Sequence, residues 1–294
     1  MEFVRPTTFA DALAEKAARP LAVPILGGTD LMVGLNAGHP APPALLDLTA
    51  VDELNAWAVD GDEVWIGAGV TYRRLITELG ALCPGLALAA RTVGSPQIRN
   101  RGTLAGNLGT ASPAGDTHPV LLATGAVVEA ASVRGQRTIP IDDFYLGVKR
   151  HALAPDELIR GVRLPVRRGP QQFAKVGPRN AMVIAVCSVA VALDVARRTV
   201  RVGVGSVAPT PRRAPAAEEL AGELPWDGGP LDEDVARRFG AAAAAATAPI
   251  DDVRGTAAYR RHAVEVLARR TLTWALADLD RPQAWDGKPE SGRA

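Results

Sequence analysis

The order of apolar and polar positions divides the chain into short segments separated by turn residues. In the first half, short apolar or alternating runs predict strands, with hairpin turns at Asp60-Gly61 and Arg134-Gly135. These predicted strands cover residues 21–26, 45–48, 55–59, 63–67, 126–131, 137–141 and 158–164. Capping residues, among them Thr8 and Thr71, and the helical periodicity after them predict helices over about 8–19, 72–80 and 84–92, and a buried helical turn over 119–123.

A polar, turn-rich segment at 166–170 separates this half from a second pattern. Three antiparallel strands are predicted over 172–176, 183–195 and 200–207, with an irregular connection at 209–215 after them. Helices are predicted over 216–221, 232–247 and 255–279. We therefore expect an α+β protein with one domain over 1–166, a C-terminal α+β domain over 171–280, and a polar tail over 281–294.

Composition narrows the function classes without naming one. Of the 294 residues, 47% are hydrophobic, and 33 basic and 32 acidic residues leave a net charge of +1. This balance does not indicate a nucleic-acid or membrane surface. No secretory signal or membrane span is expected, and two cysteines do not make a disulfide framework. We expect a cytoplasmic protein.

The stretch from Arg99 to Asp116 concentrates small and hydroxyl-bearing residues. Leu104 and Leu108 can anchor it to a core, while four glycines allow backbone N–H groups to approach a ligand closely. The glycines are Gly102, Gly106, Gly109 and Gly115. Asp116 ends the stretch with a carboxylate, which suits sugar hydroxyls. The pattern favours a nucleotide site, and a glycine-rich surface loop is the alternative.

A second glycine segment lies earlier in the chain. Gly27-Gly28-Thr29 directly follows the strand predicted over 21–26, so its N–H groups and hydroxyl could face a phosphate. Most Gly-Gly turns are only turns, so this segment by itself is weak support for a nucleotide site.

Together the two segments resemble the FAD-binding subunit of the molybdenum hydroxylases, the xanthine dehydrogenase and aerobic carbon monoxide dehydrogenase type. One family motif reads roughly Q-x-R-N-x-G-T-[IL]-G-G-[NS], followed by [AS]-x-P-x-x-D. This chain matches it at Gln97, Arg99-Asn100, 102–107, Ala111, Pro113 and Asp116, with Ala105 in place of the usual glycine. The other motif reads A-G-G-[HT]-[SDE]-L, against Leu26-Gly-Gly-Thr-Asp-Leu31 here.

The resemblance implies a fold and a site. It implies two subdomains, about 1–54 and 55–166, which clasp FAD in a fold of the vanillyl-alcohol-oxidase-like type, followed by a C-terminal three-stranded antiparallel sheet with helices. Asp116 would bind the ribose, Ile159 would contact the ring, and the Lys175 cation would stabilise charge at the flavin edge. The residues expected to bind FAD are Ile25, Leu26, Gly27, Gly28, Thr29, Asp30, Leu31, Val93, Thr103, Ala105, Gly106, Asn107, Thr110, Asp116, Ile159 and Lys175.

The resemblance also implies partners. A large subunit would carry the molybdenum cofactor, and a small subunit would carry [2Fe-2S] clusters that pass electrons to this FAD. NAD, a quinone or dioxygen would be the final acceptor. In this chain we expect no metal site and no catalytic acid, base or nucleophile, because the four histidines share no ligand spacing and no C-x-x-C occurs.

Two other functions remain open from the sequence. A self-contained FAD oxidoreductase of the same superfamily would need its own substrate pocket and catalytic acid. A binding or assembly module could keep the fold without FAD.

Overall fold

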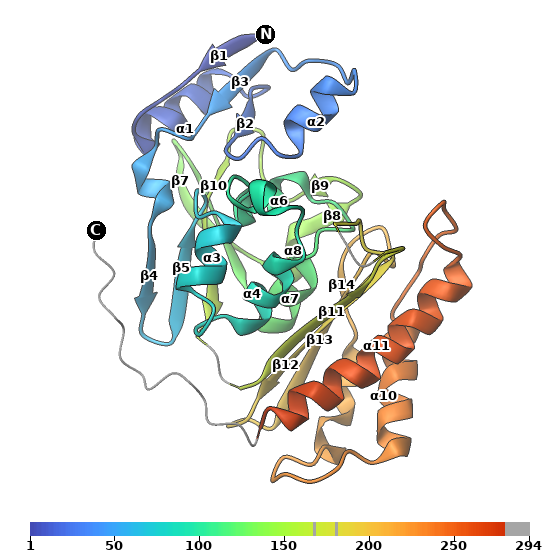
Figure 1. The fold of residues 1–294 in the computed structure, drawn as a ribbon. Helices are drawn as coiled ribbons and strands as arrows, with labels where there is room; N and C mark the ends of the chain where they lie inside the picture. The colour runs from blue at the N-terminus through green and yellow to red at the C-terminus, as the bar shows by residue number, and fades with distance from the viewer. Residues whose placement is uncertain (167–168, 180–181, 280–294) are drawn as a thin grey trace.

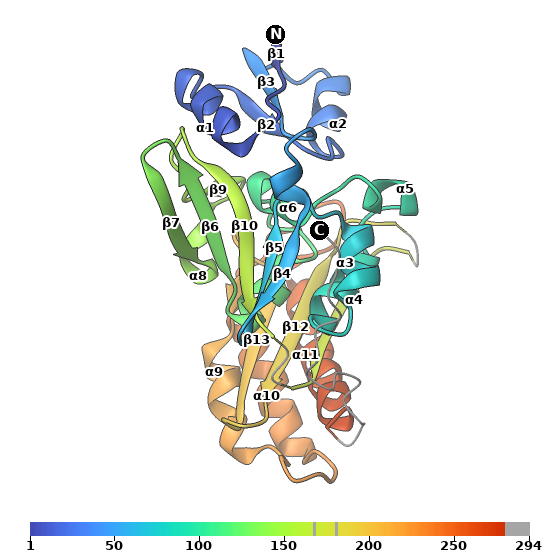
Figure 2. The same ribbon diagram turned by 90° about the vertical axis from the view of Figure 1, so that its left-hand side faces the viewer.

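The computed structural model describes residues 1–166, 169–179 and 182–279, so the expected polar tail at 281–294 lies outside the described residues. Three structural regions follow one another along the long axis of the molecule in chain order (Figures 1 and 2). A small N-terminal region is followed by a five-stranded sheet with short helices, and then by a C-terminal sheet covered by two long helices.

The N-terminal region is a three-stranded parallel sheet in the order β1-β3-β2. Its elements are β1 (Glu2–Val4), α1 (Phe9–Ala18), β2 (Val23–Ile25), α2 (Leu31–Asn36), β3 (Ala44–Asp47) and the 3-10 helix η1 (Asp52–Asn55). Thr8 caps α1 as predicted, because its hydroxyl accepts a hydrogen bond from the Asp11 N–H at 3.1 Å. The sequence pattern does not predict α2, which has no fully buried residue to mark a core-facing side.

The middle region is a five-stranded antiparallel sheet in the order β4-β5-β10-β6-β7. Its strands are β4 (Trp57–Asp60), β5 (Glu63–Gly67), β6 (Val127–Ser132), β7 (Gly135–Pro140) and β10 (Leu158–Pro165). Asp60 pairs with Glu63, and Ser132 pairs with Gly135, so both predicted hairpins are confirmed. A separate two-stranded ribbon is formed by β8 (Tyr145–Gly147) and β9 (Arg150–His151).

Six short helices accompany this sheet within the described residues. They are α3 (Tyr72–Glu78), α4 (Pro84–Arg91), α5 (Pro96–Arg99), α6 (Leu104–Thr110), α7 (His118–Thr124) and α8 (Ile141–Phe144). Three of them, α3, α4 and α7, match predictions. The glycine-rich stretch is not the surface loop considered as its alternative, because α6 forms its centre. Thr103 caps α6, and Leu104 and Leu108 are buried four residues apart, as an amphipathic helix requires.

The C-terminal sheet has four antiparallel strands in the order β11-β12-β13-β14, so the expected three-stranded sheet is corrected. The strands are β11 (Gln171–Val176), β12 (Cys187–Asp194), β13 (Thr199–Gly205) and β14 (Arg212–Arg213). The last strand lies in the segment expected to be irregular, because two residues are too few to show an alternating pattern. The strand expected over 183–195 begins only at Cys187, so the apolar residues before it belong to a connection.

This sheet lies between the middle region and the C-terminal helices (Figure 1). Those helices are α9 (Pro215–Glu218), η2 (Glu219–Glu223), α10 (Glu233–Ala245) and α11 (Ala257–Ala277). One face of the sheet packs large aliphatic residues such as Val189 and Val202 into the core beneath α10 and α11.

The other face of the C-terminal sheet carries small residues and contacts α7. A Cβ added at Gly203 would lie 2.0 Å from the Pro119 carbonyl oxygen, and one at Gly205 would lie 2.8 Å from the Pro119 ring. These glycines let the helix approach the strand closely, and Ala190 joins the core of the middle region. Large and small residues alternate along these strands. One face of the sheet therefore packs beneath the C-terminal helices, while the other lies close against α7.

Candidate functional site

The two glycine segments meet in space. A Cβ at Gly27 would lie only 2.1 Å from the Arg101 carbonyl oxygen and 2.9 Å from the Gly102 Cα, so the two backbones touch at this point. The Thr110 hydroxyl donates to Asp30 Oδ2 at 3.2 Å, which joins the segments a second time. The structure thus brings together the two segments that the sequence placed about seventy residues apart.

A positive φ explains the glycine at position 28 in the first segment, but not the one at position 102 in the second. Gly28 has φ +69°, in the left-handed region that other residues rarely adopt. Gly102 does not need a positive φ, but its carbonyl accepts the Tyr72 N–H at 2.9 Å. That hydrogen bond fixes the second segment to the first turn of α3.

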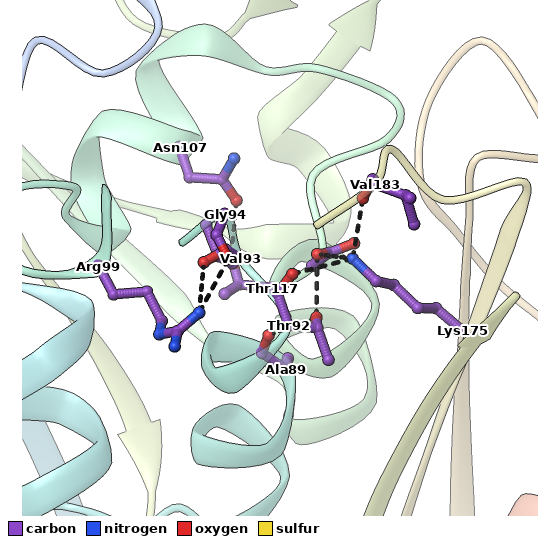
Figure 3. Close-up of polar contacts among 10 residues, drawn as sticks. Ala89, Thr92, Val93, Gly94, Arg99, Asn107, Thr117, Lys175 and Val183 are labelled. Atoms are coloured by element: carbon purple, nitrogen blue, oxygen red, sulfur yellow. Dashed lines mark hydrogen bonds and ion pairs between the residues drawn. The ribbon is translucent and has the colours of Figure 1, made fainter. Parts of the chain in front are cut away.

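Helix α6 presents several of the expected site residues. The Thr103 hydroxyl is its cap and accepts the Gly106 N–H at 3.0 Å, while Ala105 is buried. Asn107 is oriented from outside the helix, because its Oδ1 accepts the Thr117 hydroxyl at 2.7 Å (Figure 3). Gly106 is exposed, and an added Cβ there would meet only Thr103 Oγ1 within 4 Å, at 3.1 Å.

Asp116 and Lys175, expected at different parts of the cofactor, form one buried ion pair. Lys175 Nζ lies 2.6 Å from Asp116 Oδ2, and the two side chains are 11% and 9% exposed. The same ammonium donates to the carbonyl oxygens of Thr92 at 3.0 Å and Val183 at 3.2 Å (Figure 3). The ion pair joins the middle region to strand β11 of the C-terminal sheet.

The Asp116 carboxylate is only partly satisfied by these contacts. Oδ2 also accepts the Thr92 hydroxyl at 2.9 Å. Among the described residues, Oδ1 has no hydrogen-bond partner although it is buried. Burial raises the pKa of the Asp116 carboxyl, and the Lys175 ammonium opposes that shift. A buried acceptor without a partner is costly, so Oδ1 is suited to a ligand hydroxyl.

His118 packs directly behind this loop. Its side chain is fully buried, and its Nδ1 makes a short hydrogen bond with the Tyr145 hydroxyl. A Cβ at Gly115 would lie 2.1 Å from His118 Nε2, so only glycine fits there. Burial lowers the pKa of His118 to about 3 and raises that of Tyr145, so both are neutral at ordinary pH.

Two other expected contacts, Val93 and Ile159, pack with the hydrophobic core. Val93 is partly buried, and its carbonyl, like that of Gly94, accepts a hydrogen bond from Arg99 Nη1, at 3.1 and 2.9 Å (Figure 3). Ile159 is 8% exposed and belongs to the core on β10, the strand that packs against α6.

The sequence reasoning missed two polar residues of the site. Thr92 holds Asp116 through its hydroxyl and Lys175 through its carbonyl, and Thr117 orients Asn107. Thr92 also ends α4 as its cap residue, so its position gives no local signal of a binding role. Only the fold places it beside Asp116, 24 residues away in sequence.

Comparison with known proteins identifies the family. A family described as the FAD binding domain in molybdopterin dehydrogenase matches residues 1–167, and one described as the CO dehydrogenase flavoprotein C-terminal domain matches residues 172–275. This chain belongs to the FAD-binding medium subunits of the molybdenum hydroxylases.

Relatives and solved structures match over nearly the full length. The nicotine 6-hydroxylase medium subunit of Paenarthrobacter nicotinovorans is 32% identical, over 94% of this chain and 97% of that protein. The carbon monoxide dehydrogenase medium chain of Afipia carboxidovorans is 31% identical, over 94% and 96%. A chain of reconstituted CO dehydrogenase from Oligotropha carboxidovorans superposes with a TM-score of 0.86 at 29% identity, covering 94% of this chain and 98% of that one.

Family membership confirms the central expectations of the sequence analysis. The chain is an FAD-binding oxidoreductase subunit, and it is the medium subunit of a heteromeric enzyme. The fold agrees as a mixed α/β FAD-binding domain followed by a C-terminal domain.

Over residues 1–166, 169–179 and 182–279, the structure contains no cluster of three or more possible metal ligands and no helix long and apolar enough to cross a membrane.

Proposed function

We propose that a molybdopterin large subunit supplies electrons to an iron–sulfur small subunit, and that this FAD-binding subunit receives them from there. It would then pass them to NAD, a quinone or dioxygen. The observation that carries the proposal is the junction of the two glycine segments, together with the buried Asp116 carboxylate at the end of the second segment, whose Oδ1 has no partner among the described residues. A pyrophosphate needs closely approaching N–H groups, and a ribose needs a hydrogen-bond acceptor. The two touching glycine segments can supply the N–H groups, and Asp116 Oδ1, at the end of the second segment, can supply the acceptor.

We assign the residues of the FAD site as follows. The glycine segments would bind the pyrophosphate, Asp116 Oδ1 would accept a ribose hydroxyl, and Val93 and Ile159 would supply apolar contacts. The full set is Ile25, Leu26, Gly27, Gly28, Thr29, Asp30, Leu31, Val93, Thr103, Ala105, Gly106, Asn107, Thr110, Asp116, Ile159 and Lys175. Bound FAD would supply the electron-carrying chemistry, and the residues of this chain would hold and orient it.

We further propose a division into an FAD-binding domain over 1–166, with subdomains about 1–54 and 55–166 in a vanillyl-alcohol-oxidase-like fold, and a C-terminal domain over 171–280. Two separate hydrophobic cores support the division between the FAD-binding and C-terminal domains.

Spectroscopy of the purified subunit tests the FAD assignment. We expect a yellow protein with about one noncovalent FAD per chain, since neither glycine segment contains a histidine or cysteine that could form a covalent link. Acid precipitation should release the colour into the supernatant. A colourless protein that cannot be reconstituted with FAD would contradict the proposal.

Copurification tests the electron path. The subunit with both partners should oxidise an N-heterocycle, an aldehyde or carbon monoxide, whereas the subunit by itself should not. Turnover of any of these substrates by the isolated chain would instead support a self-contained flavoenzyme.

A further inference from the structure

Lys175 has three partners around its ammonium group, and each comes from a different part of the chain. They are Asp116 Oδ2 at 2.6 Å, the Thr92 carbonyl at 3.0 Å and the Val183 carbonyl at 3.2 Å. An ammonium group has three N–H donors, so these acceptors use all of them. Contact between Lys175 and a flavin would require it to give up one of these partners.

The effect of Lys175 on Asp116 is different and direct. The ammonium and the Thr92 hydroxyl both bind Oδ2, whereas the buried Oδ1 has no hydrogen-bond partner within residues 1–166, 169–179 and 182–279. A cation 2.6 Å away favours the ionised carboxylate against the cost of burial. It also fixes the orientation of the carboxylate, because one oxygen is tied by two hydrogen bonds.

We propose that Lys175 is a positioning residue that promotes FAD binding through Asp116, by keeping that carboxylate ionised and aimed with Oδ1 free. The inference rests on the proposed FAD site. It also gives the C-terminal sheet a part in cofactor binding, because Lys175 lies on β11 while Asp116 lies in the middle region.

Other titratable groups near Asp116 stay in one protonation state around neutral pH. Tyr72, on α3, is buried and its pKa is raised. His118, two residues from Asp116, has its pKa lowered to about 3, and burial raises the pKa of Tyr145, which contacts it. The Arg99 guanidinium donates hydrogen bonds to the carbonyls of Val93 and Gly94, next to Thr92. The pH dependence of FAD binding therefore reports on Asp116.

The test measures the FAD dissociation constant by fluorescence quenching, between pH 5 and 9, for the full-length protein. Lys175→Met should weaken binding about tenfold or more at pH 7, the range for a charged hydrogen bond. Without the ammonium, the pKa of Asp116 should rise. The loss of FAD affinity on acidification should therefore occur at a higher pH than in wild type. Lys175→Arg keeps the charge and should restore much of both. Lys149→Met makes the same substitution at an exposed lysine and should match wild type.

A double-mutant cycle separates action through Asp116 from direct contact. Asp116→Asn should weaken FAD binding, and adding Lys175→Met to it should change affinity by less than about twofold, because residues of one ion pair have strongly non-additive effects. A further tenfold loss in the double variant would overturn the proposal. The comparison of Asp116→Asn with the double variant remains informative if Lys175→Met alone does not fold, since the double variant leaves no unpaired charge at this pair.

Two further results would overturn the inference. One is an affinity loss in Lys175→Met that is equal at every pH, which would indicate a purely structural role. The other is unchanged affinity with a shifted flavin reduction potential, which would place Lys175 at the flavin edge. In both cases wild-type protein binds FAD, whereas failure of the proposed function would appear as wild-type protein that does not bind it.

Discussion

The two glycine segments of the site differ in how they are held. The second segment contains a capped helix, and its Leu104 and Leu108 are buried in the core. The first segment leads into α2, which has no fully buried residue, and its Gly27 lies so close to Arg101 that an added Cβ would overlap the Arg101 carbonyl. The difference indicates that the core fixes the second segment, and that the first is placed largely by lying on the second.

Substitution of Gly27 should break this arrangement most strongly. In Gly27→Val, the new side chain would overlap the Arg101 carbonyl, and neither backbone can move aside cheaply. We expect a loss of about 3 kcal/mol or more in the free energy of unfolding, measured by urea denaturation, together with loss of FAD binding.

Gly28→Ala is the matched control at the next residue. Its Cβ would have side-chain neighbours at 3.3 Å, so the main cost is the positive φ of +69°, about 1–2 kcal/mol. Equal stability loss in Gly27→Val and Gly28→Ala would show that the backbone contact between the segments is unimportant.

Gly106→Val should separate ligand binding from folding. Gly106 is exposed on α6, and an added Cβ has one neighbour within 4 Å, so stability should change by less than about 1 kcal/mol. A side chain on the side where the pyrophosphate is proposed to approach should weaken FAD binding tenfold or more, about 1.4 kcal/mol, measured by fluorescence quenching. Wild-type affinity would remove Gly106 from the site.

The buried histidine behind the second segment predicts a pH dependence. The folded pKa of His118 is about 3, below its usual 6.5, so its stabilising contribution is complete above pH 6.5 and is lost as the pH falls toward 3. Between pH 6.5 and 5, wild type should lose about 2 kcal/mol relative to His118→Gln, in urea unfolding of each protein. Parallel pH profiles would show that His118 becomes protonated without cost in the folded state.

Gly109→Ala should have the smallest effect on stability, and it should stabilise the protein. Gly109 lies in α6, and nothing lies within 4 Å of an added Cβ. Alanine should raise the free energy of unfolding by about 0.5–1 kcal/mol and leave FAD affinity unchanged. A destabilised Gly109→Ala protein would mean that α6 is held less firmly than its buried leucines indicate.

Local patterns in the sequence were sufficient for much of the fold. Both hairpins and the helix caps at Thr8 and Thr71 were predicted correctly, because turn geometry and capping depend on residues only a few positions apart. Helix α6 and strand β14 were missed, since glycines obscure the periodicity of one and the other has only two residues.

The sequence by itself determined the family, because two glycine motifs and a carboxylate at fixed spacing identify the FAD-binding subunits. Only the tertiary structure decided how the site residues combine. Lys175 and Asp116 are 59 residues apart, and no local pattern shows that Lys175 and Thr92 both donate hydrogen bonds to the buried Asp116 carboxylate. That pairing depends on the small residues of β12 and β13, which let the C-terminal sheet approach α7 closely enough to bring Lys175 to the carboxylate.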